Sequence, residues 1–130
     1  MQILVPAAHG SESLETVTLV NVLRRADIRV SLASVEDGTA LNMTRRWYGG
    51  ICAAPALSLS PNGLLDGKQA TCHPHFREKL LHFVDRPVVI DGHCMTSQGA
   101  GTGLEFALTW VETLLGKQAR EQVADAILVA

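Results

Sequence analysis

The sequence has few cysteines, little net charge and no long apolar run. Its three cysteines, Cys52, Cys72 and Cys94, are an odd number without regular spacing, which predicts reduced thiols in an intracellular compartment and excludes a disulfide scaffold. The formal net charge is only −2 and no basic run occurs, so binding to nucleic acid or to an anionic membrane is not indicated. No apolar run approaches the roughly 20 residues that a membrane-spanning helix needs. These absences favour a small molecule or a protein as the partner.

The beginning of the sequence also lacks a targeting signal. Residues 1–5 are too short for the apolar region of a signal peptide and contain no basic region. We therefore expect a soluble protein in the cytoplasm, or in an organelle such as the plastid if a transit peptide has been removed. The 130 residues suit one domain that buries about two thirds of its unfolded surface.

The first third of the chain is typical of a βαβ unit. Residues 2–8 form a continuous apolar run, which predicts a strand buried on both faces in a parallel sheet. Residues 12–26 have helical periodicity with Ser11 as the predicted N-cap, and residues 28–35 predict a second strand. The apolar positions of the predicted helix are Leu19, Val22, Leu23 and Ala26.

The middle of the chain predicts short elements joined by loops. Residues 36–47 have no sustained period, so we expect a loop with at most one helical turn. A strand is predicted over 47–53 and a short helix over 54–59, followed by a turn at 61–63.

The next segment predicts a strand, a helix and a hairpin. The strand is expected over 69–72 and the helix over 76–84. Two further strands, over 86–90 and 93–97, flank Asp91-Gly92, a dipeptide that favours a β-hairpin turn.

The last third predicts a helix that faces the core. Thr102-Gly103-Leu104-Glu105 has the pattern of a capping box, and Gly116 is the predicted end of the helix. An amphipathic tail over 118–129 completes the chain. The apolar face of the helix consists of Leu104, Ala107, Leu108, Val111, Leu114 and Leu115.

The stretch Gly49-Gly50-Ile51-Cys52-Ala53-Ala54-Pro55 predicts a strand that turns sharply into a helix. Small flanking residues leave room for a strained backbone at Cys52, and Pro55 suits the first turn of a helix. At such a turn a thiolate lies near unsatisfied backbone N–H groups, which stabilise negative charge. Cys52 is therefore the candidate nucleophile, and the alternative is a buried cysteine in an Ala-rich core segment.

Glu15 and His73 are the candidate partners of Cys52. In an open α/β sheet, ligands bind outside the carboxyl ends of the strands, and these two residues follow other predicted strands. Glu15 either complements the helix dipole in the first turn, or turns inward, where burial would favour a protonated carboxyl that stabilises the thiolate. His73 is either a structural cap or a general acid/base. A thiolate, a proton carrier and hydrogen-bond donors are what nucleophilic cysteine chemistry requires.

A metal site is not predicted, and no other cofactor is expected. No C-x-x-C or H-x-x-x-H spacing occurs, and neighbouring residues on a strand point to opposite faces. His9 is interpreted as a loop histidine rather than a ligand. The two groups of cysteine and histidine that are close in sequence are Cys72 with His73 and His75, and His93 with Cys94.

Several motifs, in a consistent order along the chain, resemble the ThiJ/PfpI superfamily and, within it, the group of the Parkinson-disease protein deglycase. They are Gly10-Ser11-Glu12-Ser13-Leu14-Glu15-Thr16, Asn21-Val22-Leu23-Arg24-Arg25-Ala26, Ile51-Cys52-Ala53-Ala54-Pro55, Thr71-Cys72-His73-Pro74, Thr96-Ser97-Gln98-Gly99-Ala100-Gly101-Thr102 and Glu105-Phe106-Ala107-Leu108.

The resemblance implies an α/β fold, a flavodoxin-like three-layer sandwich with a mostly parallel sheet, in a homodimer without a cofactor. It implies a catalytic set of Cys52, Glu15 and His73, in which a reactive cysteine is hydrogen-bonded to a protonated glutamate with a histidine close by. The implied activity is that of a glyoxalase or deglycase that needs no glutathione. It would act on a small reactive dicarbonyl such as methylglyoxal or glyoxal, or on a glycated protein, and the cysteine would sense oxidation.

The sequence departs from the family pattern between Val35 and Trp47. The family carries several further strands and helices there, including a Leu-Pro-Gly-Gly segment that faces the cysteine, so we expect one domain over 1–130 that is incomplete between about residues 36 and 47 and has lost central strands and helices. Gln98 replaces a common arginine and Ala100 a common proline. The alternative to the enzyme is therefore a non-catalytic, degenerate or splice-variant member that acts as a redox-responsive or dimerising binding module.

Overall fold

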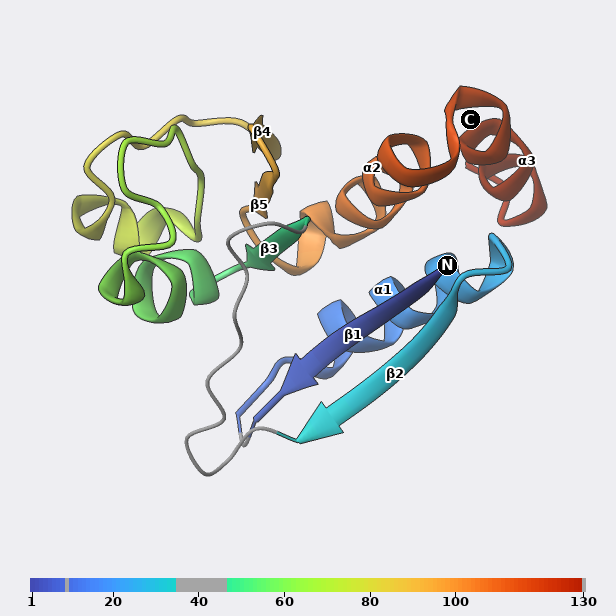
Figure 1. The fold of residues 1–130 in the computed structure, drawn as a ribbon, viewed down its shortest axis with the longest axis horizontal. Coiled ribbons are helices and arrows are strands. Elements are labelled where there is room, and N and C mark those ends of the chain that lie inside the picture. Colours follow the sequence, from blue (N-terminus) through green and yellow to red (C-terminus); the bar gives the residue numbers. More distant parts are fainter. Residues whose placement is uncertain (9, 35–46, 130) are drawn as a thin grey trace. The chain divides into compact units, whose positions relative to one another are not determined.

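The computed structural model describes residues 1–8, 10–34 and 47–129. Its residues group into two compact units, one formed by 1–39 with 104–130 and the other by 40–103. Figure 1 shows the elements of both units. The predicted loop over 36–47, apart from Trp47, and the predicted loop histidine His9 lie outside the described residues. A single domain that is incomplete near this loop stays a prediction.

The first unit begins with the predicted βαβ arrangement. Strand β1 (Gln2–Ala7) is followed by helix α1 (Ser13–Arg25) and strand β2 (Arg29–Ser34). The two strands pair in parallel, in a register that runs from Gln2 opposite Arg29 to Ala7 opposite Ser34. Figure 1 shows α1 alongside both strands, as a crossover connection requires.

The prediction that β1 is buried on both faces was wrong. Val5 of β1 and Val30 of β2 are buried, whereas Leu4 is 47% exposed. Successive side chains of a strand point to opposite faces, and this sheet has two strands with α1 as their crossover helix. A continuous apolar run in the sequence therefore did not require cover on both sides.

The N-cap of α1 is Glu12 rather than the predicted Ser11. The Glu12 carboxylate accepts a hydrogen bond from the Glu15 amide at 2.8 Å, and its charge complements the positive end of the helix. The Ser11 hydroxyl accepts from the Ala8 amide at 3.0 Å instead. Ser11 lies one residue too early and stabilises the turn that precedes the helix.

The second unit contains a three-stranded sheet in the order β3-β5-β4. Strand β3 (Tyr48–Ile51) runs parallel to β5 (Cys94–Ser97), and β4 (Val88–Asp91) runs antiparallel to β5. This confirms the predicted hairpin, although its connecting residues are Gly92 and His93. Gly92 has φ of +60°, which a glycine adopts without strain.

The predicted strand over 69–72 and the predicted helix over 76–84 were both wrong. Ala70 makes an isolated parallel bridge to Phe83, with hydrogen bonds from the Ala70 amide to the His82 carbonyl and from the Val84 amide to the Ala70 carbonyl. These bonds need extended backbone near residue 83. Only a short 3₁₀ helix, Pro74–Lys79, forms before it, because the tertiary pairing overrides the local helical pattern.

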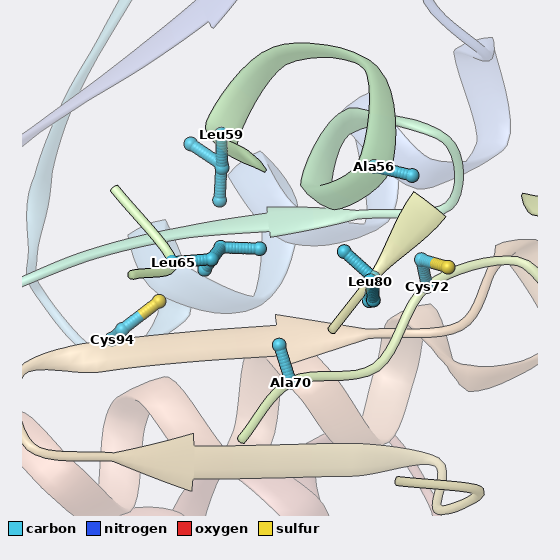
Figure 2. Packing of buried hydrophobic residues seen from close by; sticks show 7 residues of the cluster. All are labelled: Ala56, Leu59, Leu65, Ala70, Cys72, Leu80 and Cys94. Atoms are coloured by element: carbon cyan, nitrogen blue, oxygen red, sulfur yellow. The ribbon is translucent and has the colours of Figure 1, made fainter. Parts of the chain in front are cut away.

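The core of the second unit is an apolar cluster that includes two cysteines (Figure 2). The helical turn Pro55–Leu59, predicted as a helix from residue 54, contributes two residues to it. Tyr48 packs against the cluster and donates a hydrogen bond from its hydroxyl to the Leu64 carbonyl at 2.6 Å. The buried members of the cluster are Ala56, Leu59, Leu65, Ala70, Cys72, Leu80 and Cys94.

We expect the Cys94 thiol to make stability fall at alkaline pH. The pKa of Cys94 is raised to about 11, mainly by burial. The hydrogen bond with the Tyr48 hydroxyl and the charge of Lys68 oppose this rise. An unfolded cysteine titrates near 8.5, so only the unfolded state loses this proton between about pH 8.5 and pH 11. The free energy of unfolding should fall across that range by about 1–3 kcal/mol more in the wild type than in Cys94→Ala.

Urea denaturation at a series of pH values measures this difference. Below pH 8 the two proteins should show pH profiles of unfolding free energy that run parallel, because the thiol is protonated in both states. Parallel profiles up to pH 11 as well would contradict a raised pKa at Cys94.

Helices α2 (Gly103–Leu115) and α3 (Lys117–Ala126) end the chain. Gly116, with φ of +92°, separates them, which confirms the predicted end of α2. The predicted capping box was wrong, because the Glu105 carboxylate pairs with Arg120 of α3 at 2.8 Å. The Thr102 hydroxyl instead bonds to the amide and carbonyl of Gly99. No helix among the described residues is long and apolar enough to cross a membrane.

Candidate active site

Cys52 lies directly after the last residue of β3, at a sharp turn of the backbone. Its φ is +62°, a left-handed conformation that is strained for any residue with a Cβ atom. A Cβ atom at Gly50 would lie 3.1 Å from the Leu59 side chain and 3.4 Å from Pro55, so a larger residue there would require Leu59 to shift. The Cys52 residue is half-buried. These features confirm the predicted strained elbow and exclude a fully buried cysteine.

Two backbone hydrogen bonds hold the turn in place. The Cys52 amide donates to the Ser97 carbonyl at 3.0 Å, and the Cys52 carbonyl accepts from the His73 amide at 2.7 Å. Ser97 is fixed in turn, since its hydroxyl donates to the Pro87 carbonyl at 2.7 Å and lies 2.7 Å from the Thr102 hydroxyl. The sequence pattern identified Cys52 but not these supports, because hydrogen bonds between distant segments leave no local signal.

His73 is a neighbour of Cys52 through the backbone and caps a helix with its side chain. Its Nδ1 atom accepts a hydrogen bond from the His75 amide at 3.2 Å, at the start of the helix Pro74–Lys79. This confirms the structural-cap alternative. A neutral imidazole that accepts at Nδ1 carries its proton on Nε2, and the exposed ring leaves that atom open to a second role. A general acid/base function of His73 stays a prediction.

Glu15 lies in the first turn of α1, in the other compact unit. The residue is only 9% exposed, which agrees with a carboxyl group that turns inward rather than one that only complements the helix dipole. Burial disfavours the ionised form of a carboxyl group. The predicted association of Glu15 with Cys52 stays a prediction.

Cys72 is a residue of this site that the sequence analysis did not select. It precedes His73, is 0% exposed, and its sulfur lies 3.3 Å from the His73 carbonyl oxygen. Burial, and to a lesser degree the charge of the Cys52 thiolate, raise the pKa of the Cys72 thiol. The motif Thr71-Cys72-His73-Pro74 could have suggested it, since a strand end that supplies His73 also brings its neighbour.

The described residues show no further candidate for the site. No group of three or more histidine, cysteine or acidic residues within them could hold a metal ion. A groove of about 500 Å³ is lined by residues of α1 and by Leu32 of β2. Its lining includes none of the three predicted catalytic residues, so we assign it no chemistry.

Two buried threonines beside the site should respond differently to replacement by valine. The Thr71 amide donates to the Thr96 hydroxyl at 2.9 Å, so Thr96→Val leaves a buried N–H without an acceptor and should lower the free energy of unfolding by about 1–3 kcal/mol. The Thr71 hydroxyl is buried without a hydrogen-bond partner among the described residues. Thr71→Val should therefore be neutral or stabilising. Urea denaturation measures both, and a larger loss in Thr71→Val would contradict this assignment.

Comparisons with known proteins agree with this fold. Residues 41–113 match the DJ-1/PfpI family. Protein DJ-1 homolog A of Arabidopsis thaliana is 33% identical over 180 aligned positions, which cover 98% of this chain and 46% of that protein. Protein dj-1beta of Drosophila melanogaster is 30% identical over 181 positions, which cover 98% of this chain and 96% of that protein.

A solved structure and a named enzyme also match. The structure of oxidized Toxoplasma gondii DJ-1 has a TM-score of 0.90 and 26% identity, and the match covers 99% of this chain and 98% of that one. A Caenorhabditis elegans protein named glutathione-independent glyoxalase DJR-1.2 is 35% identical over 86 residues, which cover 63% of this chain and 45% of that protein.

The chain therefore belongs to the DJ-1/PfpI family, and its fold is the flavodoxin-like α/β fold that the motifs implied. It spans slightly less than half the length of the A. thaliana relative. The alignments with the plant and fly proteins run over 180 and 181 positions, whereas the chain has 130 residues. At least 50 positions of each alignment therefore have no residue of this chain, which agrees with the predicted loss of an internal segment.

Proposed function

We propose that this chain is a cysteine-dependent, cofactor-free enzyme of the glyoxalase or deglycase type. Its proposed substrates are methylglyoxal, glyoxal or early glycation adducts. The observation that carries the proposal is the position of Cys52 directly after β3. This residue is half-buried and its backbone has φ of +62°. Strained backbone of this kind is concentrated at functional sites. The name of the C. elegans relative supports the same reaction class.

In the proposed reaction with methylglyoxal, the Cys52 thiolate attacks the aldehyde carbon and a C–S bond forms, giving a hemithioacetal. A base then removes the hydrogen from that carbon, and a proton is delivered to the neighbouring ketone carbon. The resulting thioester is hydrolysed by water, which releases lactate and restores the thiol. One carbon is oxidised and the other is reduced, so the balance requires no external oxidant or reductant.

Glu15 and His73 are the proposed proton carriers. A buried glutamate in its protonated form can donate to the thiolate and later move the proton between the two carbons. The Nε2 atom of His73 is the second candidate, because Nδ1 is occupied by the His75 amide. The predicted homodimer belongs to the same proposal, and analytical ultracentrifugation tests it.

A second candidate function is a non-catalytic, redox-responsive or dimerising binding module. It is favoured by the missing alignment positions and by the place of β3 at one end of the order β3-β5-β4 among the described strands. An unpaired strand edge near Cys52 would leave the site less enclosed and more exposed to solvent.

Two measurements on the Cys72→Ser/Cys94→Ser double variant distinguish these candidates, because Cys52 is then the remaining thiol. The enzyme should consume methylglyoxal without glutathione and release lactate. The pH midpoint of Cys52 alkylation should lie well below the value near 8.5 of an ordinary thiol. A midpoint near 8.5 without turnover would overturn the proposal and leave the binding module.

A further inference from the structure

Cys52 and Cys72 are held next to each other by the backbone. The His73 amide, which follows Cys72 directly, donates to the Cys52 carbonyl at 2.7 Å. Standard backbone dimensions then limit the distance between the two Cα atoms to about 7.5 Å. A disulfide usually joins Cα atoms about 4.4–6.8 Å apart. Both cysteines belong to the same compact unit, so small local movement can bring the sulfurs together.

The two thiols differ in access to solvent. Cys52 is half-buried, whereas Cys72 is 0% exposed. In Figure 2 the Cys72 sulfur lies at the edge of the apolar cluster, on the side to which the arrows of β3 and β5 point. A dissolved oxidant therefore reaches Cys52 first, and Cys72 can react only with a group presented from within the protein.

Electrostatics favour oxidation of Cys52 before Cys72 reacts. Burial and the Cys52 thiolate both raise the pKa of Cys72, burial more strongly. When Cys52 becomes an uncharged sulfenic acid, the contribution of its negative charge disappears. Cys72 then loses its proton more easily and becomes the better nucleophile.

We propose that Cys72 is the resolving cysteine of Cys52, so that oxidation by a peroxide ends in a reversible Cys52–Cys72 disulfide. This inference rests on the proposed reactive thiol at Cys52. Hydrogen peroxide oxidises the Cys52 thiolate to the sulfenic acid and releases hydroxide. The Cys72 sulfur attacks the Cys52 sulfur, the S–S bond forms, the S–O bond breaks, and the hydroxyl leaves as water with the Cys72 proton. A dithiol reductant returns both thiols.

Cys94 is the matched control, because it is a buried thiol in the same unit as Cys52 and Cys72. It pairs with Tyr48 at the beginning of β3, whereas Cys52 follows the end of that strand. Because Cys52 is four residues beyond Tyr48, it lies about 13 Å farther along the strand direction than Cys94. This distance excludes a disulfide between Cys52 and Cys94 without large rearrangement.

Peptide mapping after oxidation tests the inference directly. The folded protein is treated with a several-fold molar excess of hydrogen peroxide, because two added oxygens require two peroxide molecules, and its remaining thiols are alkylated before digestion with trypsin. The three cysteines fall in separate peptides, 47–68, 69–77 and 80–117. We expect peptides 47–68 and 69–77 to be linked, with the loss of two hydrogens, in the wild type and in Cys94→Ser. In Cys72→Ser, peptide 47–68 should instead gain two oxygens, several-fold more than in the wild type.

The possible outcomes separate this inference from the proposed function. Equal amounts of peptide 47–68 with two added oxygens in the wild type and in Cys72→Ser, without linkage, would overturn the inference and leave Cys52 reactive. A Cys52 that stays reduced in both proteins would overturn both proposals. Methylglyoxal turnover by the reduced wild type is measured in parallel. Linkage without turnover would support the inference and count against the enzyme.

Discussion

Replacement of Cys52 by alanine is expected to lower kcat/KM for methylglyoxal on the order of 10³-fold or more. The proposed reaction forms a bond to the Cys52 sulfur, and no neighbouring thiol can substitute for it. Cys72 is fully buried, and Cys94 is buried with its pKa raised to about 11. Lactate formation measures the change, and Cys94→Ala is the matched control because it removes a thiol that the mechanism does not use. Activity within about tenfold of the wild type would exclude the C–S intermediate.

A Cys52→Gly variant should be equally inactive and yet more stable than Cys52→Ala. Both substitutions remove the sulfur and its contacts, so their difference isolates the backbone. At φ of +62° alanine keeps the left-handed strain and glycine relieves it, which should raise the free energy of unfolding by about 1 kcal/mol. Urea denaturation measures the difference. An alanine variant that is the more stable of the two would show that the elbow is not strained.

Local chemistry explains which parts of the fold could be predicted from the sequence. The elbow could be predicted because small residues such as Gly50 and Ala53 leave room beside Cys52, while Pro55 fixes φ at a value that suits the first turn of a helix. The hairpin around Gly92 and the end of α2 at Gly116 depend on single glycines with positive φ. These backbone preferences act within a few residues, so they can be predicted from the local sequence without knowledge of the rest of the chain.

Long-range hydrogen bonds explain the parts that could not be predicted. The pattern of residues 76–84 favours a helix, but Ala70 pairs with residues 82 and 84 and keeps that segment extended. The support of Cys52 by the Ser97 carbonyl has the same origin. Its donor and acceptor are 45 positions apart in the sequence, and neither residue type reveals that its backbone is used. Sequence therefore predicted the elbow at Cys52, and the structure shows the hydrogen bonds that hold it.

Glu15→Gln is the second variant with a large expected effect, a loss of turnover of about 10²–10⁴-fold. The amide has nearly the shape of the carboxyl group and can still donate a hydrogen bond, but it cannot carry a proton between the carbons of the substrate. Glu12→Gln is the matched control. It makes the same replacement of a carboxyl group by an amide three residues earlier in the sequence, at Glu12, which is exposed and caps α1 with its side chain. Steady-state lactate formation should separate the two variants clearly.

The alkylation profile of Cys52 in Glu15→Gln then identifies the protonation state of Glu15. If Glu15 is protonated, glutamine replaces one neutral donor by another, and the pH midpoint of alkylation should change little while turnover is lost. An ionised Glu15 beside the thiol would repel the thiolate, and its replacement would lower the midpoint strongly. If the turnover and the pH midpoint of alkylation both stay unchanged, Glu15 has only a structural role in α1. His73 then remains the candidate proton carrier.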